Sequence, residues 1–175
     1  MLSATDHTVL DRHLREAGTV DGGRVHQWEG ASSVLYKGRL WVYRHNARKQ
    51  CRQEMYYHSL DSVAATLTCS HGLKFWDLRR GATPRELARL QGFPESFRLP
   101  PHRAVRLFGN AVTVPCAAHA VSCVVHPHER RLTYIDLCAG IGGFACAVQA
   151  VCPSAQCVGF SEIFPASVEC YLDNF

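Results

Sequence analysis

The stretch that decides the fold is Leu132-Thr-Tyr-Ile-Asp136-Leu-Cys138-Ala-Gly140-Ile-Gly142-Gly143-Phe144. Residues 132–137 have strand-like character, a glycine-rich turn follows them, and residues 144–151 are compatible with a helix. Glycines permit positive φ angles and let a ligand approach the backbone, and the helix that follows offers unpaired N–H groups and the positive end of its dipole. The stretch therefore predicts a strand, loop and helix that together hold a nucleotide.

Taken alone, the loop is compatible with more than one ligand. Gly140, Gly142 and Ala145 have the spacing of the dinucleotide fingerprint. A second apolar strand, residues 156–160, leads to Glu162 at the distance of about 20 residues where a ribose-binding acid is expected. An ordinary glycine turn in an α/β domain is the alternative, but Asp136 and Glu162 at the strand ends favour the nucleotide site.

Read from Asp136 to Phe144, the loop resembles the first motif of the DNA cytosine-5 methyltransferases, which holds S-adenosylmethionine. Residues 158–165 likewise resemble the second motif of that family. The resemblance implies that the two oxygens of Glu162 accept hydrogen bonds from the ribose hydroxyls and that Ile163 packs against the adenine. Cys138 stands where the family usually has Phe, which removes an aromatic contact of about 1 kcal/mol.

A second region, Thr83-Pro-Arg-Glu86-Leu-Ala-Arg-Leu-Gln-Gly92-Phe-Pro94, predicts a helix of about two turns. Thr83 is the expected N-cap, Glu86 completes a capping box, and Gly92 begins the helix stop. Leu87 and Leu90 are expected to face inward. This region is similar to the ninth motif of the same family, and its twelve positions are far more specific than a glycine loop.

The third region, Arg106-Leu-Phe-Gly-Asn110-Ala-Val112-Thr-Val-Pro115, is similar to the tenth motif and leads into an apolar helix predicted for residues 113–125. The resemblance implies that Asn110 and the backbone of Ala111 and Val112 contact the methionine part of the cofactor. A helix-entry cap is the alternative role for Asn110. By resemblance, the cofactor-binding residues are therefore Asp136, Cys138, Ala139, Gly140, Gly142, Gly143, Phe144, Glu162, Ile163, Asn110, Ala111 and Val112.

The order of the motifs is unusual, because the first motif normally opens such a chain and the tenth closes it. Here the tenth comes first, so the chain resembles a circularly permuted family member in which a short linker joins neighbouring elements. The helix from residue 113 should then pack beside the strand from residue 132, with Asn110 near Gly140. The fold class is α/β, a permuted and incomplete part of a Rossmann-like S-adenosylmethionine-dependent methyltransferase fold, since two strands cannot complete such a sheet.

Four segments follow from these assignments: residues 1–60, residues 61–125 with the ninth and tenth motifs, the linker 126–131, and residues 132–175 with the first and second motifs. The first segment has no assigned role. It predicts a short helix over residues 6–17 and two strands within residues 34–43 that turn at Lys37 and Gly38. Its basic and aromatic side chains suit either a phosphate-contacting surface or a solvated hairpin. Residues 62–69 predict a further strand.

Composition limits the possibilities less than the motifs do. The chain has 175 residues, 47% of them hydrophobic, which favours one ordinary domain, and its net charge of +4 predicts neither nucleic acid nor membrane binding. The sequence contains no run of about 18 apolar residues and no signal-peptide pattern at its start, so we expect a soluble, intracellular protein without a membrane partner. The nine cysteines lack framework spacing and predict reduced thiols in the core, and no metal site is predicted.

The chemistry of cytosine-5 methylation needs a thiolate that attacks C6, and the family supplies it from a Pro-Cys-Gln segment. The sequence lacks that segment as well as Glu-Asn-Val and Gln-x-Arg-x-Arg. Pro115 and Cys116 enter the helix after the tenth motif, so Cys116 is expected to be a core thiol. We therefore predict no catalytic residue in this chain.

Three functions remain open at this point. The chain could be the S-adenosylmethionine-binding part of a DNA (cytosine-5-)-methyltransferase that acts on DNA together with a second polypeptide carrying the remaining motifs. It could be a truncated or inactive methyltransferase homologue. It could also be a nucleotide-binding regulatory module.

Overall fold

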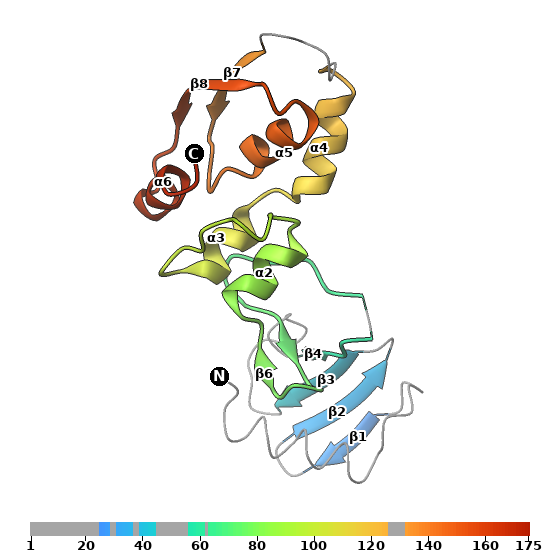
Figure 1. Ribbon diagram of the computed structural model, residues 1–175. Coiled ribbons are helices and arrows are strands. Elements are labelled where there is room, and N and C mark those ends of the chain that lie inside the picture. Colours follow the sequence, from blue (N-terminus) through green and yellow to red (C-terminus); the bar gives the residue numbers. More distant parts are fainter. Residues whose placement is uncertain (1–24, 29–30, 37–38, 45–55, 62, 126–131) are drawn as a thin grey trace. The chain divides into compact units, whose positions relative to one another are not determined.

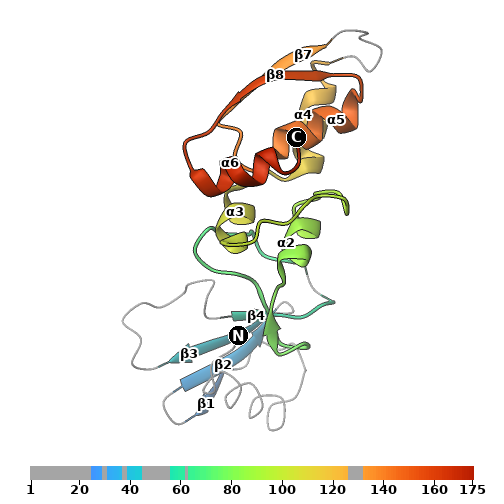
Figure 2. The same cartoon turned by 60° about the vertical axis from the view of Figure 1, so that its left-hand side comes forward.

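The computed structural model describes residues 25–28, 31–36, 39–44, 56–61, 63–125 and 132–175 (Figures 1 and 2). The chain forms two compact units instead of the single domain favoured by its length. The first comprises residues 1–66 and 71–82, and the second comprises residues 67–70 and 83–175. The predicted helix 6–17 and the linker 126–131 lie outside the described residues.

The first unit contains a six-stranded sheet in the order β1 to β6. Its strands are β1 (Val25–Trp28), β2 (Ala31–Tyr36), β3 (Arg39–Arg44), β4 (Tyr56–His58), β5 (Lys74–Phe75) and β6 (Arg80–Gly81). The antiparallel pairing of β2 with β3, in which Tyr36 lies opposite Arg39, confirms the two predicted strands. Their turn at residues 37–38 and the basic side chains of this region lie outside what the structure describes.

The predicted strand over residues 62–69 is wrong, because residues 63–68 form no regular structure. In the second unit, a Cβ at Gly109 would lie 2.3 Å from the carbonyl carbon of Thr68. The backbone at Thr68 thus packs closely against the helix that contains Gly109. The local sequence of residues 62–69 does not reveal this contact.

Helix α2 (Pro84–Leu90) forms as its sequence predicts. The N–H of Glu86 donates to Thr83 Oγ1 at 3.3 Å, and the N–H of Thr83 donates to Glu86 Oε2 at 2.7 Å, which closes the capping box. Leu87 is buried, but Leu90 is 41% exposed, contrary to the prediction. Leu90 is the last residue of α2, so no further helical turn covers it, and Ala88 is the second buried residue instead.

The remaining elements of the second unit are α3 (Ala104–Asn110), α4 (Val114–Ser122), β7 (Thr133–Leu137), α5 (Gly143–Val151), β8 (Gln156–Ser161) and α6 (Pro165–Leu172). Strands β7 and β8 pair in parallel, which confirms the predicted strand, loop, helix and strand. Helix α4 ends three residues before the predicted limit. It packs against α5, and the two helices are neighbours in both views (Figures 1 and 2).

Among the residues that the structure describes, side chains cover one face of the small sheet of the second unit and leave the other exposed. On the covered face, Phe160 of β8 stacks on Tyr171 of α6 with ring centroids 4.2 Å apart. On the other face, Ile135, Leu137 and Val158 are 62%, 70% and 60% exposed. Within the described residues the sheet has two strands, as expected of an incomplete methyltransferase fold.

The cysteines only partly follow the prediction of core thiols. Cys146 and Cys170 are buried and Cys157 is half-buried, whereas Cys116, Cys123 and Cys138 are exposed. In α4 the buried residues are Val114 and Ala117, so Cys116 lies on another side of the helix. Its assignment to the core was wrong.

Candidate functional site

The glycine loop after β7 adopts the conformation that its residues favour. Gly140 and Gly142 have φ angles of +56° and +87°, which cost a glycine little. Cys138 also has a positive φ, +55°, which is uncommon for a residue with a side chain. The N–H of Ala139 donates to the carbonyl oxygen of Ser161 at 2.9 Å, so the loop is held at the carboxyl end of β8.

Glu162 connects this loop to the segment that follows β8. Its Oε2 accepts from the N–H of Gly140 at 2.8 Å, and its Oε1 accepts from the N–H groups of Ile163 and Phe164 at 2.7 and 2.8 Å. These hydrogen bonds lower the pKa of Glu162 below its ordinary value, and the one from Phe164 has the largest effect. The carboxylate is therefore ionised at neutral pH.

The same hydrogen bonds limit what Glu162 can offer to a ligand. A carboxylate has about four acceptor positions, two on each oxygen. Both positions on Oε1 are used by backbone N–H groups, and one on Oε2 is used by Gly140. The geometry leaves one position for a ligand hydroxyl, whereas the sequence suggested that both oxygens would be available.

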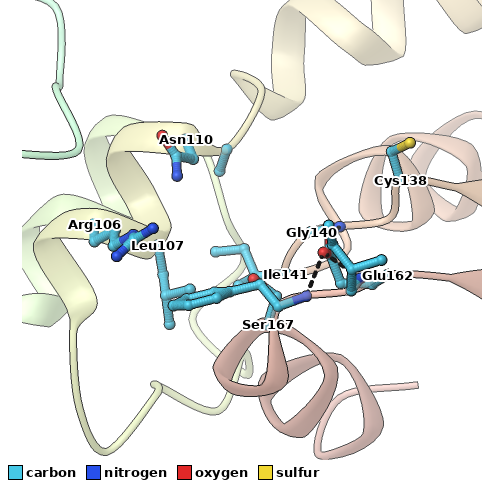
Figure 3. A pocket seen from close by; sticks show the side chains of 11 residues that line it. Arg106, Leu107, Asn110, Cys138, Gly140, Ile141, Glu162 and Ser167 are labelled. Atoms are coloured by element: carbon cyan, nitrogen blue, oxygen red, sulfur yellow. Dashed lines mark hydrogen bonds between the residues drawn. The ribbon is translucent and has the colours of Figure 1, made fainter.

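A pocket of about 370 Å³ lies between the glycine loop, the residues after β8, and helices α3 and α6 (Figure 3). This volume falls in the range of small-molecule sites. Its lining consists of Arg106, Leu107, Asn110, Ala111, Cys138, Gly140, Ile141, Glu162, Ile163, Phe164 and Ser167. Arg106 and Asn110 project from α3, and Glu162 lies with Gly140 on the opposite side (Figure 3).

The pocket brings together half of the predicted cofactor-binding residues, and Asn110 shares it with Gly140 as expected. Those that line it are Asn110, Ala111, Cys138, Gly140, Glu162 and Ile163. Asn110 is the last residue of α3, so the alternative role as a helix-entry cap is wrong.

The other six predicted residues do not line the pocket. Ala139 and Asp136 are buried, and Phe144 is 47% exposed on α5. A Cβ at Gly142 would lie 2.1 Å from the ring of Phe175, and one at Gly143 would lie 2.7 Å from Val112. These two glycines and Val112 thus serve close packing beneath the loop, and the motif pattern does not distinguish that role from ligand contact.

Five lining residues were not predicted from the sequence: Arg106, Leu107, Ile141, Phe164 and Ser167. For Arg106 a signal existed, because it precedes Asn110 by four residues and both lie in one helix. Residues at that spacing share a helix face. For Ser167 no local signal exists, since it reaches the pocket only through the packing of α6.

Gln91 holds the segment between α3 and α4 in place, a role that the sequence did not reveal. Its side-chain amide donates to the carbonyl oxygens of Phe108 and Ala111 at 2.7 and 3.2 Å, and its Oε1 accepts from the hydroxyl of Thr113 at 2.8 Å. The side chain is 8% exposed. The ninth-motif region thereby fixes the backbone of the tenth, including pocket residue Ala111.

Asp136 lies behind the loop and not in the pocket. It is 5% exposed, and its Oδ2 has no hydrogen-bond partner within the described part of the chain. Burial raises the pKa of Asp136, and a hydrogen bond with Tyr171 opposes that shift. Burial also raises the pKa of the neighbouring Tyr134 to about 12.

The thiols of Cys146 and Cys170 are buried in the core of the second unit. Burial raises the pKa of Cys146 to about 11 and that of Cys170 to about 12, so both are protonated at neutral pH. Cys138 lines the pocket, while the exposed Cys116 does not. Among the described residues, no three His, Cys, Asp or Glu side chains are placed to hold a metal ion.

The family model for C-5 cytosine-specific DNA methylases matches residues 5–125, which is more than half of the chain. This chain belongs to the C-5 cytosine-specific DNA methylase family. The match includes the ninth-motif and tenth-motif regions and begins well before them, within the segment left without a role. It ends before the linker and the glycine loop.

Type II methyltransferases resemble the chain over shorter stretches. M.HgiCI of Herpetosiphon aurantiacus is 49% identical over 61 residues, which are 31% of this chain and 14% of that protein. M.DsaV of Dactylococcopsis salina is 48% identical over 60 residues, 33% of this chain and 15% of that protein. M.NlaX of Neisseria lactamica is 58% identical over 38 residues, 21% of this chain and 12% of that protein.

Each of these matches thus covers about one seventh of its relative or less. The family match establishes a mixed α/β chain of the S-adenosylmethionine-dependent methyltransferase fold. None of the helices in the described ranges is long and apolar enough to cross a membrane.

Proposed function

We propose that this family member provides the S-adenosylmethionine pocket of a DNA (cytosine-5-)-methyltransferase. The observation that supports this most is the pocket in which Asn110, Gly140 and Glu162 lie together, although they come from different motifs. Family membership makes S-adenosylmethionine the expected methyl donor and DNA the expected substrate.

The residues of the pocket fit a nucleoside with an amino-acid side arm. A Cβ added to Gly140 would have no atom within 4 Å, so the backbone there faces open space that a ligand can approach. The free acceptor position on Glu162 suits a ribose hydroxyl, and Ile163, which is 98% exposed, offers an apolar surface to a purine. Asn110 would then face the amino-acid end.

When bound, S-adenosylmethionine supplies an electrophilic methyl group on its sulfonium. The residues of this chain have binding roles. Glu162 orients the ribose while its own position is fixed by three backbone N–H groups. Gln91 fixes the backbone at Ala111.

We further propose that a second polypeptide completes the enzyme. The bare face with Ile135, Leu137 and Val158 supports this, because exposed apolar clusters on a sheet commonly pack against another element. The partner would carry the nucleophilic cysteine and the target-recognition residues, neither of which we assign to this chain. A truncated, inactive homologue and a regulatory module that binds nucleotide are the alternatives.

Titration calorimetry tests the pocket assignment. S-adenosylhomocysteine should bind the chain more tightly than NAD, and Glu162→Ala should weaken that binding by about tenfold, the effect expected for one hydrogen bond to a charged group. Glu169→Ala is the matched control, because Glu169 is an exposed acid on α6 that does not line the pocket. Circular dichroism at the titration temperature shows whether each variant is folded.

Tighter binding of NAD than of S-adenosylhomocysteine would favour the interpretation of the glycine loop as a dinucleotide-binding site. Equal affinities of the wild-type chain and Glu162→Ala for S-adenosylhomocysteine would remove the basis for the site.

A further inference from the structure

Arg106 stands out among the pocket residues because the function proposed above gives it no role. It lines the pocket from α3, one helical turn before Asn110 (Figure 3). Of the eleven lining residues, only Arg106 and Glu162 carry a charge at neutral pH. A ligand that fits this pocket is therefore presented with one anion and one cation from different elements.

The guanidinium of Arg106 is held over the ring of Phe164, with its Cζ 4.5 Å from the ring centroid. This cation–π contact orients the side chain without using its N–H donors. Phe164 is in turn fixed through its backbone N–H, which donates to Glu162 Oε1. The position of Arg106 is thus coupled to that of the proposed ribose-binding acid.

Within the described part of the chain, Arg106 forms no ion pair. Its five N–H donors remain available in a planar fork that matches a carboxylate in two parallel hydrogen bonds. Glu162 does not fill this role, because three of its acceptor positions are taken by backbone N–H groups. The natural partner for Arg106 is an anionic group that the ligand brings.

We infer that Arg106 binds the α-carboxylate of the amino-acid arm of the cofactor and so selects nucleosides that carry this arm. The inference rests on the proposed S-adenosylmethionine pocket. It assigns the two charged residues to different parts of one ligand: Glu162 to the ribose and Arg106 to the carboxylate, which is the only anionic group of S-adenosylmethionine.

Two ligands separate this role from a general effect on the pocket. S-adenosylhomocysteine has the carboxylate, whereas 5′-methylthioadenosine has the same adenosine and thioether without the amino-acid arm. In titration calorimetry on the full chain, Arg106→Gln should weaken the binding of S-adenosylhomocysteine about tenfold or more and leave the affinity for 5′-methylthioadenosine unchanged within twofold. Arg106→Lys keeps the charge but loses the fork, so its loss should be intermediate.

Arg103→Gln is the matched control. Arg103 lies over the same Phe164 ring, 5.7 Å from its centroid, but does not line the pocket. Its substitution should leave the affinity for both ligands within twofold of the wild-type chain.

If Arg106→Gln lowers the affinity for both ligands equally, or lowers neither, the inference is overturned while the proposed pocket stays in place. If the wild-type chain binds neither ligand, the proposed function fails and the inference fails with it.

Discussion

Replacing Glu162 by Gln tests how the glycine loop is held in the folded chain. The carboxylate accepts three backbone N–H groups, those of Gly140, Ile163 and Phe164. The amide keeps one oxygen, which can still accept from Ile163 and Phe164. Its NH₂ group then faces the N–H of Gly140, so two donors oppose each other and this hydrogen bond is lost.

The expected cost is that of one hydrogen bond to a charged acceptor, about 1.5–3 kcal/mol in the free energy of unfolding. We expect the lower end, because solvent screens a partly exposed carboxylate. Urea unfolding at pH 7, followed by circular dichroism, measures this difference between the variant and the wild-type chain.

The pH dependence has a defined sign. The folded-state pKa of Glu162 lies below its ordinary value of 4.5, so the stabilisation is fully present above that pH. It should disappear as the pH falls through the folded-state pKa, because the protonated carboxyl no longer accepts as an anion. The difference in the free energy of unfolding between the wild-type chain and Glu162→Gln should therefore be largest near neutral pH and become smaller in acid.

Glu169→Gln makes the same chemical change on an exposed part of α6 and should leave the free energy of unfolding nearly unchanged. Equal stability of Glu162→Gln and the wild-type chain at pH 7 would refute the reasoning. So would a difference that stays constant between pH 7 and pH 3.

Two other predictions concern the loop glycines and the partner. Gly142→Ala places a Cβ 2.1 Å from the ring of Phe175 at a φ of +87°. It should therefore lower the unfolding temperature more than Gly140→Ala, whose Cβ meets no atom within 4 Å and which has only the backbone strain of its positive φ, about 1–2 kcal/mol. Equal shifts of the unfolding temperature for the two variants in calorimetry would contradict the packing role of Gly142. Purified alone, the chain should transfer no tritiated methyl group to duplex DNA. Addition of a polypeptide carrying the Pro-Cys-Gln segment should restore transfer, and Asn110→Ala in this chain should abolish it again. Activity of the isolated chain that disappears in Cys116→Ser would refute the two-chain proposal.

Local interactions explain why several elements could be predicted from the sequence. The start of α2 depends on Thr83 and Glu86, which are three residues apart, and their capping box forms as expected. The glycine loop likewise depends on residues that need positive φ angles, and it lies between β7 and α5 as predicted. In both places, the conformational preferences that form the element belong to residues within a few positions of one another, whereas the hydrogen bond from Gly140 to Glu162 that also holds the loop spans 22 residues.

Predictions that depended on which side of an element is covered were less successful. Leu90 and Cys116 were both expected in the core and are exposed. Residues 62–69 were expected to pair as a strand, yet Thr68 packs its backbone against Gly109 of α3. The contact of Thr68 joins residues that lie 41 positions apart (68 and 109), and neither periodicity nor local propensity contains that information.

The sequence by itself determined the family, the order of its motifs, and the local structure of the loop and helices, because each of these depends on short runs of residues. Only the tertiary structure decided which residues meet in the pocket. It brought Arg106 and Asn110 of α3 to Gly140 and Glu162, and it turned Gly142, Gly143 and Asp136 away from that pocket. The physical reason is that close packing and the saturation of backbone N–H groups act between distant segments, so a residue's role depends on contacts that form only when the chain is folded.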